Sequence, residues 1–335
     1  MPLYNSNTEI DLFDLNSNDR LFLHKSGREL YIQTENEYLA TLGGETIWLK
    51  YSQLASNCNF VWSIAENTNY VFFATESPGR VFRLNPTTDE FVDLGQVSGE
   101  GSLRAIICAN DDSIIVGSSS GKLYRSTNNG VSWTEVLNFG DNCQDSLFLA
   151  NNGDLILGTD GNCNLYHSTN NGVNWSLNHT FPDTGVFSFI ERNTDIYVGT
   201  NGKIYKSTDG GVSWSNVANT SAWLVYDFII DNNNKLLFSG RPNAGIWKEG
   251  TDDSQWNQIF SSTTNDWAYC LEKKNNIIYT GTALNGTIYA TPDNGSTWID
   301  QGRLGTEKKV YSMKLLNNGT LIAGSGDQGW VFRLL

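Results

Sequence analysis

Large aromatic or charged side chains occupy one position that recurs about every forty residues along the chain. The residues at this position are Trp62, Arg104, Asp145, Phe187, Tyr226, Tyr269 and Tyr311. Exposed aromatic rings beside a few polar groups suit the flat faces of sugar rings, which they contact through apolar surface and fixed hydrogen bonds. With three residues from nearby segments, the candidate ligand-binding set is Trp62, Arg104, Asp145, Trp223, Tyr226, Arg241, Trp267, Tyr269 and Tyr311. The alternative is that most of these rings pack between neighbouring repeats.

Three acidic residues could add a catalytic chemistry to this set. Asp145, Asp227 and Asp266 lie in the segments around the recurring position. Glycosidases use two carboxyl groups at a fixed separation, which a sequence does not show. An aspartate near the start of a strand also commonly caps a turn. A hydrolase or lyase acting on a polysaccharide is therefore an alternative, and we assign no catalytic residue.

Metal and nucleotide sites find little support in the sequence. The three histidines, His24, His167 and His179, are far apart, and no Asp-x-Asp-x-Asp-Gly loop is present. Residues 324–329 read GSGDQG and match a dinucleotide-binding pattern, but a strand-like segment follows them instead of a helix. We expect neither a metal nor another cofactor.

The composition favours a folded, all-β protein. Of the 335 residues, 39% are hydrophobic and 17% are charged, which excludes intrinsic disorder. Glycine is plentiful, proline is scarce, and no segment shows a sustained apolar period of 3.6 residues. The net charge of −14 argues against a nucleic-acid partner, because such proteins need a basic face to bind phosphate.

The first residues and the cysteines bear on the cellular setting. Residues 1–6 have neither the basic start nor the apolar run of a secretory signal, and no later segment is long and apolar enough to span a membrane. The five cysteines lack a Cys-x-x-Cys spacing, although Cys143 and Cys163 could meet across neighbouring loops. We expect no membrane insertion, and a virion or extracellular setting reached without a cleaved signal peptide. The alternative is the cytoplasm.

An eight-residue sequence, which we call the octet, marks the repeat. Residues 126–133 read STNNGVSW, and similar octets occupy 168–175, 207–214 and, more loosely, 291–298. Its Asn or Asp can accept hydrogen bonds from nearby backbone amides, its Gly supplies a positive φ, and its Trp anchors the next strand. The octet therefore predicts a tight turn between two strands.

The repeat predicts both the fold and the way the ring closes. Aromatic residues that follow each turn recur about forty residues apart, at Trp48, Phe91, Trp133, Trp175, Trp214, Trp256 and Trp298. Three more short apolar segments accompany each of them, and four short strands per repeat are typical of a propeller blade. The last repeat ends before its fourth strand, while residues 46–51 are an unpaired fourth strand. We predict a seven-bladed β-propeller with four-stranded antiparallel blades, closed by this N-terminal strand.

The chain divides into two predicted parts. Residues 45–335 form the propeller, and residues 1–44 form an N-terminal arm. Within the arm, residues 21–23 and 30–32 predict a hairpin, and residues 38–42 a further strand. The arm could cover one blade edge, or it could make an assembly contact.

The octet resembles the Asp box, or bacterial neuraminidase repeat, of sialidases, xyloglucan-cleaving glucanases, sortilin-type receptors and photosystem II assembly-factor propellers. Asp209 and Asp293 match the acidic residue of that motif, whereas Asn128 and Asn170 replace it. The resemblance implies a β-propeller whose octets lie on the face away from the ligand. It also implies that the ligand face is built by the loops that enter each first strand and those between second and third strands.

The resemblance does not extend to sialidase chemistry. A sialidase needs three arginines that converge on a carboxylate, for which Arg80, Arg104 and Arg241 are available, but the Phe/Tyr-Arg-Ile-Pro segment that opens such domains is missing. We expect a non-enzymatic binding or structural propeller that recognises a glycan or a protein, such as a phage tail or head decoration or another extracellular component. The alternatives are the polysaccharide-cleaving enzyme and an intracellular assembly factor.

Overall fold

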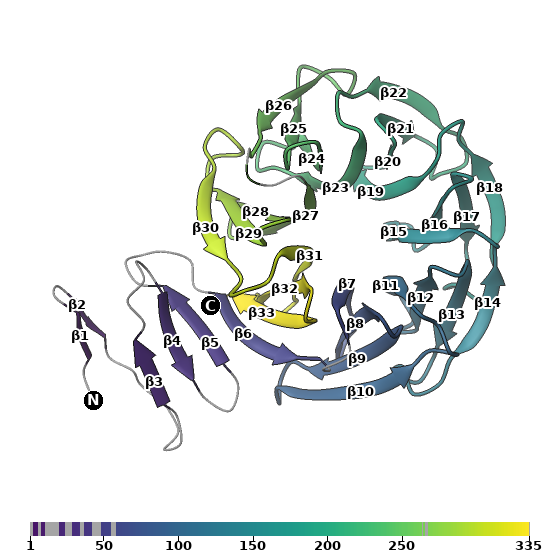
Figure 1. The fold of residues 1–335 in the computed structure, drawn as a ribbon. Coiled ribbons are helices and arrows are strands. Elements are labelled where there is room, and N and C mark those ends of the chain that lie inside the picture. The colour runs from purple at the N-terminus through teal and green to yellow at the C-terminus, as the bar shows by residue number, and fades with distance from the viewer. Residues whose placement is uncertain are drawn as a thin grey trace.

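The computed structural model describes Leu54 and residues 58–334 except 263, 265 and 266, together with the backbone of six earlier strands. The side chains of residues 143–145 also fall outside the description. All regular elements in this part of the chain are β-strands, and Figure 1 shows them arranged as a ring of sheets about a central axis.

Each blade has four strands, which follow one another from the ring axis to the rim. The innermost strands are β7 (Phe60–Glu66), β11 (Leu103–Cys108), β15 (Asn142–Leu149), β19 (Val186–Arg192), β23 (Leu224–Ile230), β27 (Ala268–Lys274) and β31 (Lys309–Leu315). The second strands are β8 (Val71–Glu76), β12 (Ile114–Ser118), β16 (Leu155–Asp160), β20 (Asp195–Thr200), β24 (Leu236–Arg241), β28 (Ile277–Thr282) and β32 (Leu321–Gly326). The third strands are β9 (Arg80–Asn85), β13 (Lys122–Ser126), β17 (Asn164–Ser168), β21 (Lys203–Ser207), β25 (Ile246–Glu249), β29 (Thr287–Thr291) and β33 (Trp330–Leu334). The outermost strands are β10 (Glu90–Gln96), β14 (Thr134–Asn138), β18 (Ser176–Thr180), β22 (Ser215–Asn219), β26 (Trp256–Phe260), β30 (Ile299–Arg303) and, from the other end of the chain, β6 (Trp48–Gln53).

Over the described residues these strands make seven blades, as predicted. Five blades are separate four-stranded sheets, and the first and last join through one residue pair, Phe60 with Gly326. The ring closes where β6 pairs antiparallel with β33, from Leu334 opposite Trp48 to Trp330 opposite Gln53. The predicted closing strand, residues 46–51, begins two residues before the observed one. The predicted fold class is confirmed.

Burial changes across each blade in the way the sequence pattern indicates. The second strands are apolar runs such as Ile114–Val116, and they are buried on both faces because a neighbouring blade covers each face. Outermost strands such as β14 and β18 contain only exposed and half-buried residues. The core is therefore a set of layers between blades.

The octets form the predicted turns, and Asn and Asp make the same hydrogen bonds in them. The amide of Ser132 donates to the Asn128 side-chain oxygen at 2.9 Å, and the amide of Ser213 donates to an Asp209 oxygen at the same distance. In each octet the first hydroxyl accepts from the glycine amide, as in the 2.9 Å bond from Gly130 to Ser126. Replacing the acid by Asn thus leaves the fold of the turn unchanged.

Small residues let neighbouring blades approach closely. A Cβ on Gly324 of β32 would lie only 2.6 Å from the Val61 side chain of the next blade, and a Cβ on Gly281 would lie 2.6 Å from Val310. Beside these contacts, the Ser312 hydroxyl donates to the Val61 carbonyl at 3.0 Å. The same arrangement recurs where the Ser188 hydroxyl donates to the backbone of the following blade.

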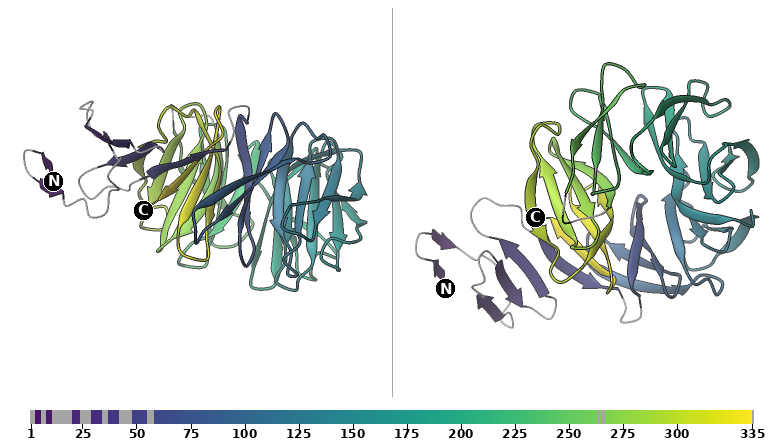
Figure 2. Two further views of the ribbon diagram at one scale, coloured as in Figure 1. Left: turned by 90° about the horizontal axis from the view of Figure 1, so that it is seen from below. Right: turned by 45° about the horizontal axis from the view of Figure 1, so that its top comes forward.

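The strands before β6 form small sheets of their own. β1 (Leu3–Asn5) pairs with β2 (Thr8–Ile10), and β3 (Arg20–Leu23), β4 (Glu29–Gln33) and β5 (Glu37–Thr41) form a three-stranded antiparallel sheet. The predicted hairpin and further strand are thus present in the backbone. Figures 1 and 2 show the three-stranded sheet beside β6, outside the ring. The boundary at residues 44 and 45 stays a prediction.

The described residues include no helix with the length and apolar character that a membrane crossing needs.

Candidate functional site

The recurring position of the sequence coincides with a β-bulge in the innermost strands. In β7, Val61 pairs with Thr75 and Ser63 pairs with Ala74, so Trp62 is the extra, unpaired residue. The corresponding extra residues of other blades are Arg104, Phe187, Tyr226, Tyr269 and Tyr311. A bulge turns a side chain out of the regular alternation of the strand. Each of these blades therefore presents one bulge residue at the ring axis.

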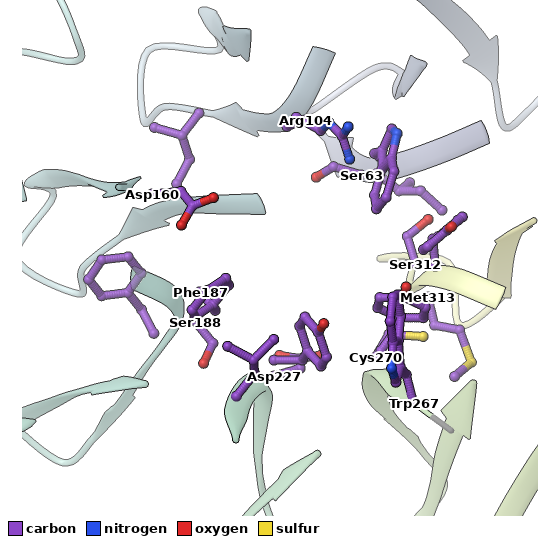
Figure 3. Close-up of a pocket in the computed structure, with 18 of the residues that line it drawn as sticks. Ser63, Arg104, Asp160, Phe187, Ser188, Asp227, Trp267, Cys270, Ser312 and Met313 are labelled. Atoms are coloured by element: carbon purple, nitrogen blue, oxygen red, sulfur yellow. The ribbon is translucent and has the colours of Figure 1, made fainter. Parts of the chain in front are cut away.

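These bulge residues meet in a cavity of about 580 Å³ (Figure 3). Seven of the nine candidate residues line it: Trp62, Arg104, Tyr226, Arg241, Trp267, Tyr269 and Tyr311. Trp223 is 63% exposed and stacks beside Arg241 without itself lining the cavity. The side chain of Asp145 lies outside the described part of the structure. The lining also contains Phe187, Asp160, Asp227 and Asn201, which the candidate set did not include.

One wall of the cavity is a continuous arc of aromatic rings from five blades. The ring centroids are 4.1 Å apart for Trp62 and Tyr311, 4.6 Å for Tyr311 and Tyr269, and 5.0 Å for Tyr269 and Tyr226. Phe187 extends the arc with an edge contact at 6.0 Å. The rings thus pack between blades, as the alternative predicted, and also face the cavity. Their mutual packing holds the wall in place before a ligand arrives.

Arg104 is held by a partner that the sequence did not reveal. Its guanidinium lies 4.0 Å from the Trp62 ring centroid and 3.1 Å from the Glu76 carboxylate. The same carboxylate accepts the indole N–H of Trp62 at 2.6 Å. Glu76 is the last residue of β8, and the matching last residues of β16 and β24 are Asp160 and Arg241. Three of the seven second strands thus end in a charged residue, and this part of the pattern was visible in the sequence.

Arg241 has a similar aromatic setting but a different charge environment. Its guanidinium lies 5.1 Å from the Trp267 ring centroid and 5.5 Å from that of Trp223. Its Nε, like that of Arg104, is buried and makes no hydrogen bond. Within the described part of the chain, no carboxylate forms an ion pair with this arginine. Its positive charge therefore lacks the compensation that Glu76 gives to Arg104.

Asp227 is a carboxyl group of the cavity whose pKa is strongly raised. Its two carboxylate oxygens accept the backbone N–H groups of Phe228 and Leu271, each at 2.8 Å. Burial nevertheless raises its pKa to about 7, with the neighbouring Glu272 acting in the same direction. The bond to Leu271 joins β23 to β27 of the next blade. Asp227 thus lines the cavity and also links two blades, while Asp266 lies outside the described residues.

Other residues considered from the sequence lie elsewhere. Arg80 forms an ion pair with Asp93 of β10 and does not line the cavity, so Arg80, Arg104 and Arg241 do not converge there. His179 contacts the Phe181 ring at 4.7 Å, also away from the cavity. The described residues hold no cluster of potential metal ligands. Residues 324–329 end β32 and turn into β33, with no helix to bind a phosphate.

Comparisons with known proteins agree with this architecture. A family model described as the DUF6242 beta propeller domain matches residues 150–266, less than half of the chain. A catalytically inactive virginiamycin B lyase from Staphylococcus aureus, with quinupristin, is similar at 12% identity and a TM-score of 0.72, covering 87% of this chain and 99% of its own. YCF48 from Cyanidioschyzon merolae is similar at 13% identity and a TM-score of 0.66, covering 85% of this chain and 98% of its own.

A structure of YCF48 bound to D1 peptide is similar at 11% identity and a TM-score of 0.69, covering 88% of this chain and 96% of its own. The comparison with curated proteins found no match. At these identities the likeness concerns the fold, and membership of the Asp-box family stays a prediction. Over its described residues, the chain is a β-propeller.

Proposed function

We propose that this propeller is a non-enzymatic glycan-binding protein and that the aromatic cavity is its binding site. The arc of rings from Trp62 to Phe187 is the observation that carries the proposal. Aromatic faces contact the apolar faces of sugars, and the polar lining residues Ser63 and Asn201 can supply hydrogen bonds. The cavity volume falls within the range of about 300–1,000 Å³ typical of small-ligand sites.

A protein partner is the rival occupant of the same face. YCF48, a neighbour in fold, has been seen bound to D1 peptide. The ring arc suits a sugar because aromatic rings from five blades offer apolar surface to the flat faces of sugar rings. Aromatic-lined grooves also bind proline-rich peptides, so the binding experiment distinguishes the two occupants.

The proposal is tested on a glycan array with the purified chain and two tryptophan variants. Trp267→Ala removes a ring that lines the cavity, and the matched control Trp175→Ala removes the half-buried ring of the octet at 168–175. We expect wild type and Trp175→Ala to bind the same glycans and Trp267→Ala to lose them. Absence of wild-type binding to any glycan would refute the proposal, as would full binding by Trp267→Ala.

We further propose that the protein acts on a virion or in another extracellular setting. The three-stranded sheet β3–β5 lies outside the ring and offers a segment through which the propeller could attach to a larger particle. Immunodetection in fractionated cultures tests this setting. Recovery with particles or in the medium is expected, and recovery in the cytosol alone would favour an intracellular assembly role instead.

An enzyme acting on a polysaccharide is the second candidate function, and Asp227 is the observation that favours it. A carboxyl group with a pKa of about 7 that lines a cavity can donate or accept a proton near neutral pH. A polysaccharide panel tests this reading. Cleavage that disappears in Asp227→Asn would establish it, and an inactive wild type would remove it.

A further inference from the structure

We infer that the ligand of the cavity carries a negative charge, a carboxylate or a sulfate, that binds Arg241. The inference rests on the proposed function, because it names the class of glycan that the cavity takes. The two cavity arginines, Arg104 and Arg241, carry the argument.

Arg104 shows the complete arrangement of an arginine on this wall. Its guanidinium stacks on Trp62 at 4.0 Å and meets the Glu76 carboxylate at 3.1 Å. The face of the guanidinium is thus covered by an aromatic ring, and its edge is occupied by a carboxylate. Arginine commonly interacts in both ways at once: its planar guanidinium stacks on aromatic rings, and its N–H groups bind anionic oxygens in the same plane.

Arg241 has the stacking part of this arrangement without the anion. Two indole rings, Trp223 and Trp267, lie at 5.5 Å and 5.1 Å from its guanidinium. Among the described residues no carboxylate pairs with it, whereas Arg104 pairs with Glu76. Its buried Nε, like that of Arg104, donates no hydrogen bond. An arginine that stacks on two rings of a ligand cavity, with no carboxylate paired to it among the described residues, is arranged to receive an anion from the ligand.

The residues around Arg241 favour the binding of an anion by this arginine. The Nε of Arg241 is buried, so a charge pair at this arginine is screened less than one on the open surface. Among the described lining residues the acidic side chains are Asp227, which is partly neutral near pH 7, and Asp160. An anionic glycan therefore finds an attractive site here even though the whole chain carries a net charge of −14.

The experiment compares charged glycans with their own neutral counterparts. The array holds uronate-, sialate- and sulfate-bearing oligosaccharides beside methyl-esterified, desialylated or desulfated partners, with acidic peptides as an additional set. The proteins are wild type, Arg241→Gln and the matched control Arg83→Gln. Arg83 also stacks on a ring, that of Tyr70 at 4.4 Å, but it does not line the cavity.

We expect wild type and Arg83→Gln to prefer the charged member of each bound pair. Arg241→Gln should bind the charged member about tenfold to a hundredfold more weakly, the range expected for one lost hydrogen-bonded charge contact, and should bind the neutral member unchanged. Comparison of the carboxylate-bearing glycans with the sulfate-bearing glycans then identifies which anion Arg241 binds.

Three results would overturn the inference. Glycan binding with no preference for charge, or a preference that survives in Arg241→Gln, would remove it and leave the proposed function standing. Binding to acidic peptides alone would remove both, since the partner would then be a protein. Unchanged melting temperatures of the two arginine variants show that the comparison reports on binding.

Discussion

Tryptophan residues occur in two distinct environments in this chain. One environment contributes to the stability of the fold, and the other contributes to the proposed binding face. Trp214 of an octet packs against Phe181 and donates its indole N–H to the Gly211 carbonyl at 3.1 Å. Trp223 is 63% exposed and contacts the guanidinium of Arg241. The first ring belongs to the core between two blades, and the second belongs to the face that carries the cavity.

The two rings should therefore respond differently to truncation. Trp214→Ala should lower the free energy of unfolding by about 3 kcal/mol, because a large ring leaves a packed site. Trp223→Ala should change it by less than about 0.5 kcal/mol, as exposed substitutions do, and should weaken glycan binding. Denaturant unfolding and binding titrations measure the two effects, and equal losses of stability would contradict the distinction.

Asp227 should make stability depend on pH in the acidic to neutral range. Its folded pKa of about 7 is above its ordinary value, so the folded state holds the proton more tightly than the unfolded state. The stabilisation is complete below about pH 4 and is lost as the pH rises through 7. The melting-temperature advantage of wild type over Asp227→Asn should thus shrink between pH 4 and pH 8.

Asp252 supplies the control for this pH series. It is exposed, and hydrogen bonds from Ser254 lower its pKa, so its ionised form persists throughout the tested window above pH 5. The difference between wild type and Asp252→Asn should stay flat from pH 5 to pH 8. A flat profile for Asp227→Asn as well would show that the buried carboxyl titrates at its ordinary pKa.

The sequence located most of the aromatic and arginine residues of the cavity, and six of these could be found because they share one position in a regular repeat. It could not show that this position is a bulge, since a bulge depends on how two strands pair. The same limit explains why Glu76 was missed: its bond to Trp62 crosses a hairpin, and only the register of β7 and β8 brings the two together. The exclusion of Arg80 likewise depends on its pairing with Asp93.

At the level of elements, each bulge is matched by a small residue on the neighbouring strand. Gly324 sits opposite Ser312 in the ladder, and both contact Val61 of the next blade. The bulge directs a side chain to the cavity, while the glycine leaves room for the next blade. The cavity and the blade packing are therefore built by the same local irregularity.

Gly324→Ala should destabilise the protein by about 1–3 kcal/mol, the usual cost of overpacking a close contact. The new Cβ would lie 2.6 Å from both the Val61 side chain and the Ser312 hydroxyl. Gly101 is the control, because a Cβ there meets nothing within 4 Å and its φ is not positive. Thermal unfolding of the two variants checks the prediction, and similar melting temperatures would show that the blades can shift apart at little cost.

Strand positions were predictable from sequence because buried apolar runs and turn residues alternate regularly. The closing strand was placed two residues early, since Leu334, the last residue of β33, pairs with Trp48. Apolar character alone could not define the first residue of β6, because the register of a strand depends on its partner strand.

For the whole molecule, the ring depends on joining its two ends. β6 is the fourth strand of the last blade, and without it β33 would present an unpaired edge. Unpaired edges favour aggregation, and a blade of three strands packs less surface against its neighbours. Strands β3–β5 form a sheet of their own, and this sheet does not extend any blade.

Two truncations separate these contributions. Removal of residues 1–44 should leave the melting temperature and glycan binding nearly unchanged, because β6 and the seventh blade stay complete. Removal of residues 1–53 should lower the melting temperature by several degrees and promote aggregation, because β33 loses its partner. Differential scanning calorimetry and light scattering measure both effects. If the two truncated proteins melted at the same temperature as the full chain, closure by β6 would contribute nothing to stability, and the ring would have to be held by the contacts between blades alone.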